Sequence, residues 1–271
     1  MSTHIRVLAR VHAATLTILF FASGPALSQT QADASVSLTD TIPDSTFAGM
    51  VLTGAKLFNN ASCTFCHAAG GRGTVQRAPN LADMEWLHSM GDFEGILQTI
   101  TWGVPRVGMK AMTPRPFQML PAGGTAFNFA QRQAVAAYVW SLGNGRQPRE
   151  VQSQNEFLAM LDEGTVEEAV AFFQEHRTDS DTTLLFVERG FNSLGYEFLL
   201  FREEPDIATA IAIFELNVEL YPDAFNTWDS LGEGYMATGE TQLAIESYQR
   251  SLELNPDNTN AVTKLTELGN P

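Results

Sequence analysis

The sequence predicts an all-α protein made of two successive helical parts. In the first part, helix patterns span residues 47–59 and 129–142, with apolar positions that share a helix face. Beyond residue 146 the pattern is helical throughout, and strand signals are absent there. Two similar helix ends, 220–223 and 254–257, lie 34 residues apart. A spacing of this size indicates a helical repeat in the second part.

The two helices of the first part are expected to cross each other. Gly54 and Phe58 are four positions apart and share one face of the first helix, and a glycine there permits the close approach of another backbone. The second helix carries Tyr138 on its apolar side and is followed by the stop signal Asn144-Gly145. We therefore expect Gly54 and Phe58 to pack against Tyr138.

The residues Cys63-Thr64-Phe65-Cys66-His67 form a Cys-x-x-Cys-His motif. Two thiols at this spacing can add to the two vinyl groups of one porphyrin, and the next residue then offers an imidazole to the iron. A redox pair, a structural disulfide or half a zinc site would also use two cysteines. These are the only two cysteines of the chain, and a zinc site needs more soft ligands. The motif predicts one covalently attached haem c, with Cys63 and Cys66 as its thioether residues and His67 as an iron ligand.

The motif and its surroundings resemble a bacterial class I cytochrome c. The resemblance rests on Gly54-x-x-x-Phe58, on the haem motif, on Ala78-Pro79-Asn80-Leu81 and on the closing segment 137–142. It covers residues 47–145 and implies a small all-α fold around one haem. In this family a proline carbonyl fixes the orientation of the haem histidine, and Pro79 lies where that proline is expected.

The resemblance also implies a methionine as the second axial ligand, in a loop before the last helix. We expect Met119, because its distance to Tyr138 and the glycine pair that follows it suit the family. Met112 and Met109 remain alternatives, as does an open site. His88 is a further alternative, on an expected short helix. A thioether ligand stabilises ferrous iron and raises the reduction potential relative to two histidines.

Several other residues are expected around the haem. Arg77, Trp86 and Trp102 could donate hydrogen bonds to its propionates, because buried carboxylates need donors. The apolar lining is expected to include Phe65, Leu81, Leu87, Ile96 and Ile100.

Residues 146–271 resemble a short tetratricopeptide-repeat domain. The best repeat is 225–258, and a weaker one covers about 191–224 with a few inserted residues. In the best repeat, small residues lie where two helices cross, aromatic residues fill the gap and a proline stops the second helix; these are Gly232, Ala244, Tyr235, Tyr248 and Pro256.

Two repeats rarely bury enough surface alone, so further helices are expected around them. Residues 155–176 should supply another helical pair, with a capping box from Thr165 to Glu168, and 259–268 a closing helix. The resemblance implies a groove that binds a protein or peptide. A scaffold or a dimerisation surface remains an alternative.

The start of the chain has the pattern of an export signal. Residues 1–28 combine a positive start, an apolar stretch and a small-x-small site that predicts cleavage after Ser28. Residues 29–46 are expected to form a flexible lead-in. No other apolar run reaches 18 residues, so no stable membrane span is expected in the mature chain. These features predict a periplasmic or secreted protein.

The formal net charge is −15, which disfavours nucleic acid and anionic membrane surfaces as partners. The acidic chain suits redox partner proteins that present a basic face. The haem motif and the expected methionine ligand predict an electron-transfer protein rather than an enzyme, alone or as the cytochrome subunit of a larger redox complex. One alternative is a haem enzyme or gas sensor with an open distal site, such as a peroxidase. Another is an assembly or scaffold protein with a structural haem. Carbon monoxide binding separates the carrier from the open-site alternative.

Overall fold

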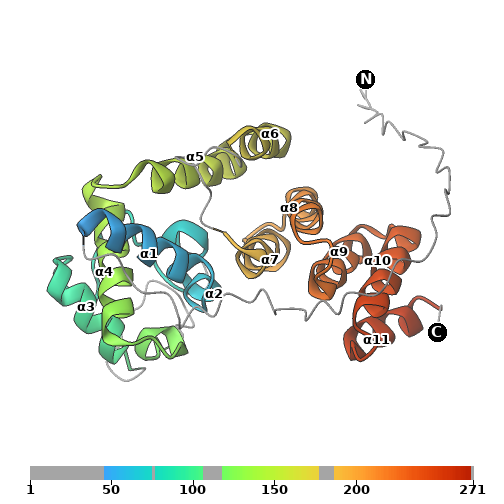
Figure 1. The fold of residues 1–271 in the computed structure, drawn as a ribbon, viewed down its shortest axis with the longest axis horizontal. Coiled ribbons are helices and arrows are strands. Elements are labelled where there is room, and N and C mark those ends of the chain that lie inside the picture. Colours follow the sequence, from blue (N-terminus) through green and yellow to red (C-terminus); the bar gives the residue numbers. More distant parts are fainter. Residues whose placement is uncertain (1–45, 75–76, 106–117, 177–185, 270–271) are drawn as a thin grey trace, which may run out of the picture. The chain divides into compact units, whose positions relative to one another are not determined.

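The computed structural model describes residues 46–74, 77–105, 118–176 and 186–269, and their regular elements are all helices (Figure 1). The expected all-α fold is thereby confirmed for these ranges. Two isolated β-bridges, Thr74 with Ala78 and Val104 with Met119, join loop segments. Within the same ranges, no helix is both long and apolar enough to cross a membrane.

The first part contains α1 (Phe47–Asn59), α2 (Cys63–His67), α3 (Phe93–Trp102) and α4 (Phe129–Asn144). Short polar side chains begin the longer helices. Thr46 accepts a hydrogen bond from the Gly49 amide at the start of α1, and Asn128 forms a capping box with Gln131 at the start of α4. Gly145, in the left-handed conformation, ends α4.

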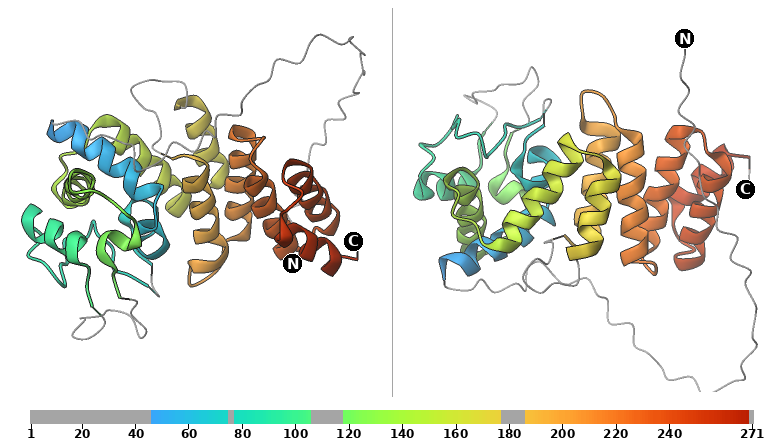
Figure 2. Two further views of the ribbon diagram at one scale, coloured as in Figure 1. Left: turned by 60° about the horizontal axis from the view of Figure 1, so that its bottom comes forward. Right: turned by 90° about the horizontal axis from the view of Figure 1, so that it is seen from above.

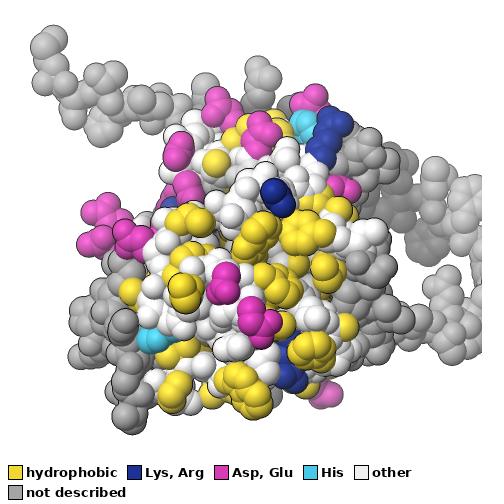
Figure 3. Space-filling view, turned by 90° about the vertical axis from the view of Figure 1, so that its left-hand side faces the viewer, with side chains coloured by type: hydrophobic (Ala, Val, Ile, Leu, Met, Phe, Trp, Pro, Cys, Tyr) yellow, Lys and Arg dark blue, Asp and Glu magenta, His cyan; other side chains and the backbone are white. Residues whose placement is uncertain are grey.

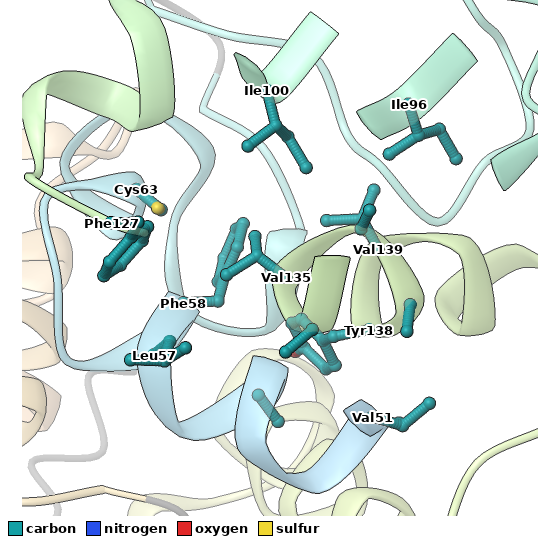
Figure 4. Close-up of a cluster of buried hydrophobic side chains, with 14 of the residues drawn as sticks. Val51, Leu57, Phe58, Cys63, Ile96, Ile100, Phe127, Val135, Tyr138 and Val139 are labelled. Atoms are coloured by element: carbon teal, nitrogen blue, oxygen red, sulfur yellow. The ribbon is translucent and has the colours of Figure 1, made fainter. Parts of the chain in front are cut away.

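Helices α1 and α4 cross at Gly54, as expected. A methyl group added at Gly54 would overlap the carbonyl oxygen of Ala134, so only glycine allows this approach. Beside the crossing, the rings of Phe58 and Tyr138 pack with centroids 5.4 Å apart. Figure 4 shows both side chains pointing into one apolar interior, which also receives the sulfur of Cys63.

The second part contains α5 (Arg149–Glu163), α6 (Val166–His176), α7 (Glu188–Tyr196), α8 (Ile207–Leu220), α9 (Phe225–Thr238), α10 (Thr241–Leu254) and α11 (Thr259–Glu267). Helix α7 continues into one π-helical turn, η4 (Glu197–Phe201). From α7 to α11 each helix packs against the next (Figure 2). The expected capping box also forms, because Thr165 and Glu168 exchange side-chain hydrogen bonds with each other's amides.

The best repeat corresponds to α9 and α10. Gly232 lies against the ring of Tyr248, where an added methyl would come within 2.8 Å of a ring carbon. Tyr248 and Ala244 are fully buried, and α10 ends at Leu254, two residues before Pro256. Helices α7 and α8 repeat the arrangement, with Gly195 against the ring of Phe214.

The two parts share buried side chains. Val151 of α5 belongs to the apolar core of the first part, and Ala69, two residues after the haem motif, belongs to the core formed mainly by α5 to α9. Leu158 of α5 lies against Gly70, where an added methyl would come within 2.6 Å of its side chain. The expected division at residue 146 therefore falls at the end of a helix, and packing continues across it.

Candidate functional site

The two cysteines lie on α2, a helix of little more than one turn. Neither forms a disulfide, and Cys63 is buried while Cys66 is half-buried. Burial raises the pKa of the Cys63 thiol to about 12. It also raises the pKa of Cys66, which the charge of Arg77 partly opposes. Both thiols therefore face an environment that disfavours charge, as the wall of an apolar cofactor pocket would.

His67 is oriented by the backbone of Pro79. Its Nδ1 lies 3.2 Å from the Pro79 carbonyl oxygen, and because a carbonyl only accepts, Nδ1 carries the proton. The other ring nitrogen, Nε2, then has a free lone pair to offer a metal. Burial lowers the pKa of His67, although the bond to Pro79 acts in the opposite direction, and this favours the neutral form that ligates metals.

A cavity of about 360 Å³ opens beside His67 and both cysteines. This volume is within the range of pockets that hold small molecules and cofactors. The walls are mostly apolar and include all five residues expected to line a haem pocket, namely Phe65, Leu81, Leu87, Ile96 and Ile100. The side chain of Phe65 nevertheless keeps half of its surface exposed.

Met119 lies in the wall of the same cavity. A pair of backbone hydrogen bonds with Val104 holds it, with N···O distances of 2.7 and 3.1 Å. Its side chain packs against the core of the first part. The structure thus brings a thioether into the cavity that His67 lines. Met112 and Met109 lie outside the described residues.

His88 also lines the cavity, but the short helix expected there is absent from the described segment 86–90. The expectation of a helix was wrong. Asn80, Asp83 and Ser89 each accept a hydrogen bond from the amide two residues ahead. Such local side-chain bonds compete with helical hydrogen bonds and favour turns.

The expected propionate donors differ in position. Trp86 lines the cavity, and its indole Nε1 is buried without a hydrogen-bond partner. A buried donor of this kind suits a ligand that brings an acceptor, as a haem carboxylate would. The structure does not bring Trp102 to the cavity: its side chain is 76% exposed and absent from the wall.

Apolar side chains are spread over the face of the molecule that carries α3 and α4 (Figure 3).

Arg77 borders the cavity in an arrangement that the sequence did not suggest. Its guanidinium lies against two rings, 4.0 Å from the centroid of Phe65 and 3.5 Å from that of Phe201. Its Nη1 donates a 2.9 Å hydrogen bond to the Phe65 carbonyl. Arg77 thus binds the haem motif itself.

Sequence reasoning also missed a buried polar network behind the motif. Asn59 accepts from the Gly70 amide at 2.9 Å and donates to Gln154 at 3.2 Å. Gln154 lies 3.5 Å from the hydroxyl of Tyr138, whose pKa burial raises to about 12. The network fixes the glycine turn after His67. The available signal was the polar Asn59 four positions after Ala55, on the buried face of α1.

Taken together, these residues fit a covalently bound haem. Two free thiols, an imidazole with an available nitrogen and a thioether share one apolar cavity that also contains an unpaired indole donor. Among the residues that the structure describes, no group of three or more His, Cys, Asp or Glu side chains could hold a metal ion by itself.

Comparisons with known proteins agree with this geometry. Residues 51–143 match the family model of cytochrome c, and residues 225–258 match a tetratricopeptide-repeat model. Two curated proteins named superkiller complex protein 3 are similar over 59 residues. The one from Mus musculus is 36% identical and the one from Homo sapiens 34% identical, over 22% of this chain. The matched segment is 4% of each relative, so the chain spans only a small part of their length.

The cytochrome c match coincides with the first part, α1 to α4, and the tetratricopeptide match with the pair α9 and α10 inside the second part. The chain therefore carries a cytochrome c domain followed by a tetratricopeptide repeat.

Proposed function

We propose that this protein is an exported cytochrome with one covalent haem c that transfers single electrons, docked to a redox partner through its helical tail. The observation that carries the proposal is the bond from His67 Nδ1 to the Pro79 carbonyl, 3.2 Å long. This bond holds the imidazole in a fixed orientation beside a cavity that both cysteines and Met119 also line.

The residues that line the cavity would bind different parts of the haem. Cys63 and Cys66 would hold haem through thioether bonds, and His67 Nε2 and the Met119 sulfur would bind its iron. The iron of a haem c bound there supplies a one-electron couple between the ferrous and ferric states. The indole of Trp86 would donate to a propionate, since its Nε1 is buried and unpaired.

The apolar wall of the cavity affects the reduction potential. Ile96, Ile100 and Val139 are buried and line the cavity, so they help to exclude water from it. A dry site and a thioether ligand both favour ferrous iron and raise the potential. A methionine already in the wall favours a carrier over an enzyme or sensor with an open site.

Export is part of the same proposal. Residues 1–28 lie outside the described ranges, and their pattern supports a cleaved signal with the cut after Ser28. A periplasmic or secreted location suits a covalent haem, because bacteria attach haem c outside the cytoplasm.

Docking through the tail rests on the repeat match and on charge. Tetratricopeptide repeats bind proteins, and with a net charge of −15 the chain suits a partner with a basic face. Tethering would raise the local concentration of electron donor or acceptor.

The decisive experiment is to express the full chain with residues 1–28 in a host that attaches haem c. Intact mass should report one added haem and the loss of 28 residues. The reduced protein should bind carbon monoxide slowly or not at all, because Met119 would already bind the iron. Rapid and complete binding of carbon monoxide would contradict the proposed role as an electron carrier. A Cys63→Ala/Cys66→Ala double variant serves as the control without covalent haem.

Docking is tested with the same full-length protein. Proteins that co-purify with it from its own host are compared with those recovered by a Leu243→Ser/Val262→Ser variant, which removes two exposed apolar side chains of the tail. Thr263→Ser is a matched surface control. If the wild type, the double variant and Thr263→Ser retained a redox partner equally, docking through the surface around Leu243 and Val262 would be contradicted.

A further inference from the structure

The tail contacts the haem motif through a short segment at the end of α7. Phe201, the last residue of the π-helical turn, packs on Phe65, with ring centroids 5.8 Å apart at an angle of 71°. Arg77 lies against both rings and donates to the Phe65 carbonyl. Phe65 is the residue just before Cys66, so Phe201 and Arg77 together hold the middle of the motif.

A second contact lies on the other side of His67. Glu197, the first residue of the same turn, accepts from the Ala69 amide at 3.2 Å and from Arg72 at 2.7 Å. Its side chain is only 8% exposed. Arg202, at 3.3 Å, and Asp162 complete the cluster, with Asp162 paired to both arginines.

The cluster places a buried negative charge, that of Glu197, among two arginines and a backbone amide. A carboxylate as buried as Glu197 is stable only when cations and amides surround it, and losing one partner leaves a costly unpaired charge. The backbone at Ala69 and the side chain of Arg72 are therefore held firmly. The two contacts flank His67, at Phe65 before it and at Ala69 after it, and both come from the segment 197–201.

We propose that the segment Glu197–Phe201 positions the haem-attachment segment, with Glu197 and Phe201 as positioning residues, so that the tail sets the coordination and reduction potential of the site. This inference rests on the proposed function and adds a second role for the tail, besides docking. The tail is then a structural part of the cytochrome.

The test uses the full-length protein loaded with haem. Phe201→Ala removes one contact, Phe201→Tyr restores the ring, and Leu200→Ala changes an exposed neighbour in the same turn. We expect Phe201→Ala to shift the midpoint potential and to weaken the thioether–iron charge-transfer band. Amide exchange over 63–74 should accelerate by about tenfold or more, because local opening becomes easier. Phe201→Tyr and Leu200→Ala should match the wild type.

Glu197→Ala tests the second contact and should accelerate exchange most at the Ala69 amide. Should this variant fail to fold, Glu197→Gln removes the charge and keeps the shape. A wild-type chain without covalent haem would overturn the proposed function and, with it, the link to the potential. If the chain carries haem, but Phe201→Ala and the Glu197 variants have the same midpoint potential and the same amide exchange rates as the wild type, this inference alone is overturned.

Discussion

A single hydrogen bond determines what His67 can do. Because Nδ1 donates to Pro79, the imidazole presents Nε2 in a fixed direction. Burial lowers the pKa of His67 and so favours its neutral form. Cys63 and Cys66 lie within four positions of it, so three of the residues that would hold the cofactor come from one turn of helix. The fourth, Met119, comes from a distant loop that the bridge to Val104 fixes.

Replacing Met119 tests this fourth residue. Met119→Ala should abolish the thioether–iron charge-transfer band and lower the midpoint potential, because the soft sulfur donor that stabilises ferrous iron is lost. The absorption spectrum and a spectroelectrochemical titration measure both effects. Met90→Ala is the control, since that side chain is 92% exposed and does not line the cavity. If Met112→Ala removed the band instead, Met119 would not be the ligand.

Asp162 should make the protein sensitive to acid. Burial acts to raise its pKa, but the charges of Arg72 and Arg202 outweigh burial and hold the pKa below its ordinary value. A lowered carboxyl pKa contributes stability above about pH 4, and this stability is lost as the pH falls through the folded-state value. We expect Asp162→Asn to cost roughly 1–2 kcal/mol at pH 7 and less below pH 4.

Denaturant unfolding of the wild type and of Asp162→Asn at several pH values measures this difference. Asp223→Asn, at an exposed position, should leave the free energy of unfolding nearly unchanged at each pH. A cost for Asp162→Asn that stayed constant down to pH 2 would contradict the expected linkage.

The residues of the site were predictable where they are close in sequence. The haem motif and the position of Pro79 follow from local spacing and from the family resemblance. The contact of Arg77 with Phe201 could not be predicted, because it joins a turn and a helix end 124 positions apart, and no local pattern encodes such tertiary packing. Trp102 illustrates the reverse case, since its sequence position near the pocket did not determine which way the side chain points.

At the scale of elements, the same feature recurs at three helix crossings of the described ranges. A glycine of one helix lies against an aromatic residue of its partner helix at Gly54 with Tyr138, at Gly195 with Phe214 and at Gly232 with Tyr248. The missing side chain lets the axes approach, and the ring fills the remaining space. The sequence predicted the first crossing from the shared face of Gly54 and Phe58, and the other two from the repeat pattern. The second follows from the weaker repeat at about 191–224, although that repeat contains the π-helical turn and a few inserted residues.

Gly54→Ala tests how tightly the first crossing is packed. The added methyl would overlap the Ala134 carbonyl, and overpacking of this kind costs about 1–3 kcal/mol. Alanine returns at most about 1 kcal/mol of helix propensity. We expect a net loss of roughly 1–2 kcal/mol in the free energy of unfolding, measured with denaturant. Lys56→Ala, on the exposed side of α1, should change it by less than about 0.5 kcal/mol. Equal effects would mean that the crossing is loose.

At the scale of the whole molecule, three apolar cores follow one another along the described part of the chain. The first surrounds α1 and α4, the second spans α5 to α9, and a third, small core lies between α10 and α11. The first two cores are joined by Val151, Leu158 and Gln154 of α5. The signal Asn144-Gly145 predicted the end of α4, but it could not report that α5 packs against the glycine turn that follows the haem motif.

This succession predicts that distance from the haem motif decides what a core substitution affects. Stacked repeats interact mainly with their neighbours, so a defect at the end of the stack stays local. Leu265 of α11 and Leu158 of α5 are both buried, and each replacement by alanine should cost about 2–5 kcal/mol. Leu265 belongs to the third core, whereas Leu158 touches Gly70 beside the motif.

Thermal unfolding followed at the haem absorption band and by far-ultraviolet circular dichroism compares the two variants. Leu265→Ala should lower only the transition seen by circular dichroism, because α11 covers the third core alone. Leu158→Ala should lower the haem-linked transition as well, because the cavity left behind loosens the turn that follows His67. If both variants lowered the haem-linked transition equally, the tail and the cytochrome domain would unfold as one cooperative unit, and stability would pass along the whole stack rather than only between neighbours.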